Sequence, residues 1–331
     1  MKALFDVHGV GLSVSGDEAA VEGVTVQLAG FHRPELVGDL AVQVRLTRDR
    51  PTLPQDQRWR SDQVLERGIV YNQGDHCWVD HHGLATSHYD YAREVGEVTA
   101  PETADLIELG FLMVHSRLGV LLERRGLVRA HGVGFALEGK AGLVLTPSGG
   151  GKSRLAIGLL RQAGVTLLSD DMVLLDTAGR AHPFPHPIGV SDPDHAGGLG
   201  PLRSFARRHH GTKWLIELDE LLSRHESGPL PLRLLAMANR VSCPPSCVTP
   251  APRRALAGAL WRDVVVGLGL PQVLELVARS GARDLWRQAP SAWRRARAAA
   301  AVLRRARTVR LDIADPDSAA RALVDELRLL G

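Results

Sequence analysis

Residues 143–153 read Leu143-Val144-Leu145-Thr146-Pro147-Ser148-Gly149-Gly150-Gly151-Lys152-Ser153, and Arg154-Leu155-Ala156-Ile157-Gly158-Leu159-Leu160 follows them. The apolar run that ends at Leu145 is short and is followed by turn residues, which is typical of a buried strand. Apolar residues recur at helical spacing after Ser153, which indicates a helix. The stretch therefore predicts a strand, a glycine loop and a helix N-terminus, in that order.

This order of elements predicts an anion-binding site. Backbone N–H groups of successive glycines can surround a phosphate, and the dipole of the following helix favours negative charge. Lys152 would supply charge for the outer phosphates, and Ser153 would ligate magnesium. The residues expected to bind a nucleotide are Ser148, Gly149, Gly150, Gly151, Lys152 and Ser153. The full phosphate-loop pattern has glycine where this chain has Thr146, so a flexible glycine turn is the alternative interpretation.

Composition indicates an ordinary globular protein. The chain has 331 residues, of which 44% are hydrophobic and 23% charged, enough for two domains or one large one. The net charge of +3 does not indicate a nucleic-acid partner. Three cysteines are too few for a disulfide framework, and neither a signal peptide nor an apolar run long enough to span a membrane is present. We therefore expect a cytoplasmic protein without a membrane partner, and whether it forms a homo-oligomer stays open.

The first hundred residues show short segments separated by turn residues, and residues 24–28, 40–46 and 68–72 are predicted strands. A hairpin is expected to turn at residues 80–83. Four histidines between His76 and His88, together with Cys77, raise the alternative of a zinc site. Strand alternation sends neighbouring side chains to opposite faces, and the ligand spacing matches no known zinc pattern, so the strand interpretation is preferred.

A second polar feature follows the glycine loop. Residues 165–169 form a predicted buried strand that ends at Asp170 and Asp171. Phosphoryl transfer needs two such carboxylates, one to hold magnesium and one to accept the proton of the attacking hydroxyl. The alternative is a turn cap with a solvated aspartate. The sequence does not decide which aspartate has which role.

The remaining segments carry weaker signals. A helix is predicted at residues 101–125. Two strands that form a hairpin are predicted at residues 127–137 and 140–145. Residues 191–212 are predicted to form a long loop beside the site. Four basic residues in or next to it could reach a phosphate or an acidic substrate, although most of them are interpreted as solvated: Arg203, Arg207, Arg208 and Lys213. Residues 252–307 are predicted to be mostly helical, with breaks at 267–271 and at Pro290. The arginine-rich face of residues 293–307 is interpreted as solvated, and binding of RNA or an anionic surface is the alternative. Residues 308–313 and 316–330 are predicted to form a last strand and a last helix. Cys243 and Cys247 are weak candidates for metal binding.

Residues 127–187 resemble the HPr serine kinase/phosphorylase family, and more closely its HPr-kinase-related branch. The resemblance is carried by His131, the glycine loop with Lys152-Ser153, the stretch Ser169-Asp170-Asp171-Met172-Val173 and the proline-rich stretch Phe184-Pro185-His186-Pro187-Ile188. The family shares a P-loop variant with ATP-dependent phosphoenolpyruvate carboxykinases and transfers a phosphoryl group from a nucleotide to a serine hydroxyl. The Glu-containing second signature of the family is not present after the aspartate pair, so phosphorylase activity and HPr as the substrate both stay open.

The resemblance implies residue roles and an architecture. It implies that Lys152, Asp170, Asp171 and His131 are catalytic, that Ser153 and Asp170 bind magnesium, and that ATP and Mg²⁺ are required. His131 by itself would be interpreted as a packed strand residue. The expected fold is α/β, with a strand-rich domain at residues 1–100, a mixed-sheet P-loop kinase core at 101–250 and a helical region completing that core at 251–331.

The expected function is an ATP-dependent kinase that transfers the γ-phosphoryl group to a hydroxyl. Related branches modify serines in peptides, including precursors of ribosomally made peptides, so serine in a peptide or small protein is the expected acceptor. Two alternatives stay open. One is a non-catalytic nucleotide-binding regulatory module, and the other is a kinase for a small molecule such as free serine.

Overall fold

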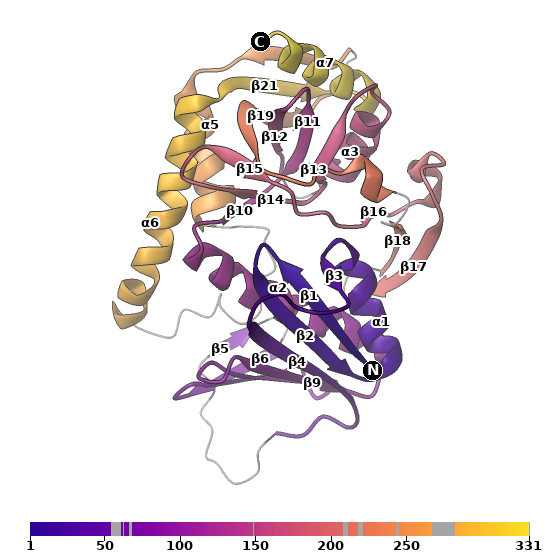
Figure 1. The fold of residues 1–331 in the computed structure, drawn as a ribbon, viewed down its shortest axis with the longest axis vertical. Helices are drawn as coiled ribbons and strands as arrows, with labels where there is room; N and C mark the ends of the chain where they lie inside the picture. Colours follow the sequence, from indigo (N-terminus) through magenta and orange to yellow (C-terminus); the bar gives the residue numbers. More distant parts are fainter. Residues whose placement is uncertain are drawn as a thin grey trace. The chain divides into compact units, whose positions relative to one another are not determined.

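The computed structural model describes residues 1–53, 61, 63–65, 68–147, 149–207, 211–217, 221–242, 245–266 and 282–330. The chain divides into two compact units. The first unit comprises Met1–Leu122, Ala206–Thr212 and Pro271–Ala289, and the second unit comprises Glu123–Phe205, Lys213–Leu270 and Pro290–Gly331. Helices accompany large mixed sheets in the described residues, so the predicted α/β class is confirmed (Figure 1).

The first unit is built on one mixed sheet. Its strands are β1 (Lys2–Val7), β2 (Val10–Gly16), β3 (His32–Arg33), β4 (Leu40–Arg48), β5 (Gln63–Leu65), β6 (Gly68–Gln73), β7 (His76–Asp80), β8 (Thr86–Asp90) and β9 (Val95–Ala100), and its helices are α1 (Glu18–Gln27), η1 (Ala29–Phe31) and α2 (Thr103–Arg124). Within the described residues the strand order is β3-β1-β2-β4-β9-β8-β7-β6-β5. β4 runs parallel to β2 and β9, and the other pairs are antiparallel. The strands predicted at 40–46 and 68–72, the hairpin turn at 80–83 and the helix at 101–125 are confirmed.

The prediction of a strand at residues 24–28 is wrong, because most of this segment belongs to α1. The carboxylate of Asp17 accepts a hydrogen bond from the N–H of Ala20 at 3.0 Å and caps the helix. Ala20, Val21 and Val24 are buried at helical spacing. β-Branched residues favour strands locally, but burial of one helical face overrides this preference.

The second unit is built on another mixed sheet. Its strands are β10 (Val128–His131), β11 (Val133–Leu137), β12 (Lys140–Leu145), β13 (Thr166–Ser169), β14 (Met172–Leu175), β15 (Arg180–His182), β19 (Leu230–Arg240), β20 (Cys247–Pro250) and β21 (Arg307–Ile313). The order is β10-β14-β15-β19-β12-β11-β13, with β21 beside β19 and β20 beside β21. β19 is parallel to β12 and β21, whereas the hairpin predicted to lead into the glycine loop is the antiparallel pair β11–β12.

Gly132 divides the single strand predicted at residues 127–137 into β10 and β11. A Cβ at Gly132 would lie 2.6 Å from the carbonyl oxygen of Val144, so only glycine allows this close crossing. β10 pairs with β14, and β11 pairs with β12 and β13. The N–H of Gly132 donates to the carbonyl oxygen of Asp171 at 3.0 Å. The break therefore brings His131, the last residue of β10, next to the aspartate pair.

The loop predicted at residues 191–212 is wrong in part. A separate small sheet has the order β16-β18-β17, formed by β16 (Ile188–Val190), β17 (Leu202–Arg207) and β18 (Gly211–Ile216), and η2 (Pro193–Ala196) lies between β16 and β17. The composition of residues 191–212 hides β17 and the start of β18, because this segment is rich in Gly, His, Asp and Arg and has few apolar residues at regular spacing.

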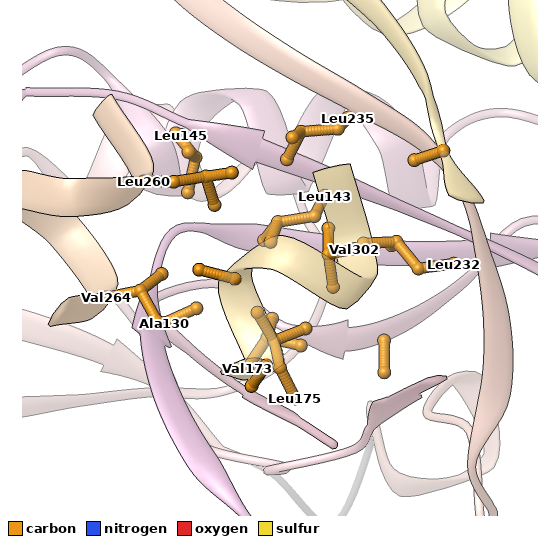
Figure 2. Packing of buried hydrophobic residues seen from close by; sticks show 14 of the residues in the cluster. Ala130, Leu143, Leu145, Val173, Leu175, Leu232, Leu235, Leu260, Val264 and Val302 are labelled. Atoms are coloured by element: carbon orange, nitrogen blue, oxygen red, sulfur yellow. The ribbon is translucent and has the colours of Figure 1, made fainter. Parts of the chain in front are cut away.

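Helices cover both faces of the second sheet. The helices are α3 (Lys152–Leu160), η3 (Leu222–Arg224), α5 (Arg253–Leu260), η4 (Trp261–Val266), α6 (Ala282–Arg305) and α7 (Pro316–Arg328). Leu143 and Leu145 belong to a buried cluster that includes Leu260, Val264 and Val302 from α5, η4 and α6, as Figure 2 shows. Val144 between them is buried as well, while α3 packs against α7 and β11. Cover on both faces explains the continuous apolar run before the glycine loop.

The helices predicted within 252–307, the last strand and the last helix are confirmed for the residues that the structure describes. The break predicted at Pro290 is wrong, because α6 continues through this residue, and the break predicted at 267–271 lies outside the described residues. None of the described helices combines the length and the apolar character needed to cross a lipid bilayer.

Candidate functional site

The glycine loop, defined here as Gly149–Gly151, connects β12 to the N-terminus of α3. Gly149 and Gly151 have φ values of 74° and 88°, in the left-handed region that other residues rarely adopt. A Cβ at Gly150 would lie 2.6 Å from the hydroxyl oxygen of Thr146, so this position has no room for a side chain. Glycine is thus needed at all three positions, twice for the backbone conformation and once for space. Ser148 lies outside the described residues.

The N-terminus of α3 is available for an anion. Its N-cap residue is Gly151, and no side chain caps the helix. The first N–H groups of a helix have no intrahelical partner and carry partial positive charge. Lys152 is the first residue of this helix, and its side chain is half-buried. The local structure therefore provides the backbone donors and the cation that a phosphate group needs.

Asp170 links the end of β13 to the glycine loop. One carboxylate oxygen, Oδ2, accepts a hydrogen bond from the hydroxyl of Ser153 at 3.2 Å. The other, Oδ1, is buried and has no hydrogen-bond partner among the described residues. Burial, followed by the charge of Asp171, raises the pKa of Asp170 to about 7. A buried carboxylate with an unused oxygen is costly in the isolated protein, and a bound cation would offset that cost.

Asp171 differs from its neighbour because its side chain is 54% exposed. The hydroxyl oxygen of Ser169 accepts hydrogen bonds from the N–H groups of Asp171 and Met172, which shape the turn after β13. Nδ1 of His131 lies 3.4 Å from Oδ1 of Asp171. Burial lowers the pKa of His131, although the charge of Asp171 opposes this shift. A largely neutral imidazole therefore lies beside an accessible carboxylate.

The ammonium group of Lys152 interacts with the same carboxylates. Burial lowers the pKa of Lys152, and the charges of Asp171 and Asp170 act in the opposite direction. Its Nζ lies 3.4 Å from the carbonyl oxygen of Pro147. The structure thus brings together the described residues that the sequence singles out, namely Gly149, Gly150, Gly151, Lys152, Ser153, Asp170, Asp171 and His131.

Asp263 was not recognised in the sequence. It is buried on η4, where its two carboxylate oxygens accept hydrogen bonds from Arg262 at 2.7 and 2.8 Å. Its charge acts to raise the pKa of both His131 and Lys152. The π-helical turn that carries Asp263 packs against β10, and such turns often occur at functional sites. The available signal in the sequence was that Asp263 directly precedes three valines, residues 264–266, which indicates a carboxylate next to a buried segment.

Lys213 is one of the four basic residues that the sequence offered as able to reach a phosphate, and its charge acts on the residues of the site. Its charge acts to lower the pKa of Asp170, of Lys152 and of the histidine at position 186. The sequence could not single out Lys213 among these four residues, because its position beside the site depends on the pairing of β18 with β16.

The oxygen atoms at the glycine loop fit magnesium. This cation prefers oxygen ligands and is usually held by one or two carboxylates together with substrate phosphates. Asp170 offers its unpartnered oxygen, and the Ser153 hydroxyl is adjacent to the same carboxylate. Within the described part of the chain, no group of three or more His, Cys, Asp or Glu side chains could hold a metal alone.

Two of the four histidines that raised the zinc alternative, His76 and His88, form an aromatic stack with Trp78 on the sheet of the first unit. The ring centroids of Trp78 and His88 lie 4.1 Å apart, and those of His76 and His88 lie 5.3 Å apart. Nδ1 of His76 and Nε2 of His88 are separated by 3.1 Å, which is a hydrogen-bond distance. Cys77 is buried, Cys247 is exposed, and Cys243 lies outside the described residues.

No protein-family model matches the sequence, and no curated protein matches it.

Proposed function

We propose that the protein is an ATP-dependent kinase of the HPr-kinase-related type, with a P-loop kinase core in its second unit. One observation carries the proposal. The Ser153 hydroxyl contacts Oδ2 of Asp170 at 3.2 Å, while Oδ1 of Asp170 is buried without a partner in the part of the chain that the structure describes. This contact joins a helix N-terminus suited to phosphate with a carboxylate suited to a cation, an arrangement that phosphoryl transfer requires.

The glycine loop would bind the nucleotide phosphates through its backbone N–H groups. Lys152 would contact the outer phosphate oxygens and stabilise the charge that develops on them during transfer. When bound, Mg²⁺ would be held by Ser153, Asp170 and phosphate oxygens and would neutralise charge on the phosphates.

Asp171 is the base in this proposal, because its carboxylate is exposed enough for an acceptor hydroxyl to reach it. The hydroxyl proton moves to Asp171, and the acceptor oxygen forms a bond to the γ-phosphorus. The bond between that phosphorus and the β,γ-bridging oxygen breaks, which releases ADP. His131, 3.4 Å from Asp171, would orient this carboxylate.

The proposed acceptor is a serine hydroxyl in a peptide or small protein. Support for this class comes from the resemblance of residues 127–187 and from the exposure of Asp171, whose carboxylate is open to solvent. A free amino acid and HPr are the competing acceptors, and a module that binds ATP without transferring phosphate is the competing function.

Mass spectrometry of reactions with Mg²⁺ and ATP would test the proposal, with serine-containing peptides, HPr and free serine offered separately as acceptors. We expect a mass gain of one phosphate on a peptide serine and none with Lys152→Ala. Arg233→Ala, a change at an exposed arginine on β19, is the control and should retain activity. ATP binding without transfer to any acceptor would favour the regulatory module.

A further inference from the structure

Lys213 and Gly189 form a paired feature of the small sheet in the second unit. β16 and β18 are antiparallel, with Val190 opposite Trp214 and Gly189 opposite Leu215. A Cβ at Gly189 would lie 1.9 Å from Cε and 2.4 Å from Nζ of Lys213. Gly189 is not among the glycines with positive φ, so its backbone conformation does not require glycine. Glycine is needed at position 189 for space instead, because the side chain of Lys213 occupies the place where a Cβ would lie.

The strand that carries Gly189 lies beside elements that form the site. The N–H of Phe184 donates to the carbonyl oxygen of Leu168 at 2.8 Å, so the segment that enters β16 runs beside the end of β13. β16 also packs against α3, the helix that begins at Lys152. The charge of Lys213 acts to lower the pKa of both Asp170 and Lys152, as expected for an ammonium close to both.

Two ammonium groups that lie close together repel each other. An anion that binds between them removes this repulsion and is attracted by both charges. Lys152 and Lys213 are both half-buried, which strengthens their interaction with a bound charge. A nucleotide triphosphate would add several negative charges to a site that already holds Asp170 and Asp171. One lysine and one divalent cation leave an excess of negative charge, and a second lysine reduces it.

We propose that Lys213 is a second cation for the γ-phosphoryl group of ATP, acting together with Lys152. The inference rests on the proposed kinase function and adds to it a catalytic residue that approaches from the small sheet. Gly189 is then a positioning residue, because its only role is to leave space for the lysine side chain.

The test compares binding of Mg-ATP and Mg-ADP to the full-length protein by calorimetry, followed by turnover of ATP. Lys213→Ala should weaken ATP binding about tenfold relative to ADP binding, because only ATP carries the group that the lysine contacts. We expect turnover to fall about a hundredfold. Lys213→Arg keeps the charge and should restore part of the ATP preference.

Gly189→Ala is the second variant, and it displaces the lysine without removing it. Since the clash is with the flexible end of a side chain, the fold should be retained, and the loss of ATP preference should resemble that of Lys213→Ala. Gly258→Ala on α5 is the matched control, because a Cβ there meets no atom within 4 Å. It should leave nucleotide binding unchanged.

The outcomes separate the two proposals. Wild-type transfer activity with an unchanged ATP preference in Lys213→Ala would overturn the role of Lys213 and leave the kinase proposal standing. A wild-type protein that binds neither nucleotide would overturn both. Loss of ATP preference in Lys213→Ala and Gly189→Ala, with Gly258→Ala unaffected, would support the inference.

Discussion

The two units each contain a charged cluster, and the clusters differ in how completely their polar atoms are paired. In the first unit, Glu94 accepts hydrogen bonds from the guanidinium of Arg117 and, at 2.7 Å, from the hydroxyl of Tyr89. The guanidinium also lies over the ring of Tyr91, 5.2 Å from its centroid. In the second unit, Oδ1 of Asp170 is buried without a hydrogen-bond partner in the described ranges.

The difference distinguishes a cluster whose charges are paired from a candidate functional cluster. The Glu94 cluster offsets the desolvation of its charges with its own contacts. The Asp170 cluster keeps two carboxylates close together and leaves one oxygen unused, an arrangement that costs stability. Such a cost is typical of sites whose missing partner is a substrate or a cation.

The largest expected effect is on catalysis, from Asp171→Asn. Loss of the base should lower phosphoryl transfer about a thousandfold, because general-base catalysis contributes factors of that order. Nucleotide binding should remain measurable, since the glycine loop and Lys152 are unchanged. Transfer of labelled phosphate from ATP, with binding followed separately, measures both quantities. Full activity of the variant would reject Asp171 as the base.

Asp170→Asn should remove a pH dependence of stability in the protein free of nucleotide and magnesium. The pKa of Asp170 is raised from 3.8 to about 7, so the folded protein binds more protons than the unfolded chain between these values. Stability therefore falls as pH rises through this window, by up to about 4 kcal/mol from this group.

Urea unfolding with a chelator present, at pH 5 and pH 8, measures this effect. The wild-type protein should lose more stability than Asp170→Asn between the two pH values, and the variant should be the more stable protein at pH 8. Equal losses in the two proteins would show that the buried carboxylate carries no such cost.

The third prediction concerns the Glu94 cluster. Arg117→Ala should lower the free energy of unfolding by about 3 kcal/mol, because it leaves the carboxylate of Glu94 without its cation. Arg93→Ala is the control, since Arg93 is exposed and lies 3.8 Å from Asp90, and its loss should cost less than about 1 kcal/mol. Denaturant unfolding measures both variants. Nucleotide binding should change in neither, and a binding loss in Arg117→Ala would mean that this cluster is not purely structural.

Local sequence patterns predicted much of the second unit. The apolar run before the glycine loop, the turn residues and the helical spacing after them specify β12, the loop and α3, because each depends on near neighbours in the chain. The same applies to the turn at Asp170, which follows directly from the end of β13. The error at residues 24–28 arose where local propensity and tertiary burial disagree, and Asp17, a good N-cap residue, was the signal that could have corrected it.

Local sequence patterns could not predict which residues from distant segments lie beside the site. His131 reaches Asp171 only because Gly132 ends β10 opposite the start of β14. Asp263 and Lys213 reach the site from η4 and β18, tens of residues away along the chain. Nothing in the residues around either position records which strand or helix will pack beside it.

By itself, the sequence determined the α/β class, the strand, glycine loop and helix around Lys152, and the pair of carboxylates after the next strand. These features depend on the conformational limits of glycine and on the spacing of apolar residues, which act over a few positions. The tertiary structure alone decided that Ser153 contacts Asp170, that His131 accompanies Asp171, and that a second lysine approaches through Gly189. Those contacts arise from sheet pairing and helix packing between distant segments, which depend on the whole chain burying its apolar surface at once.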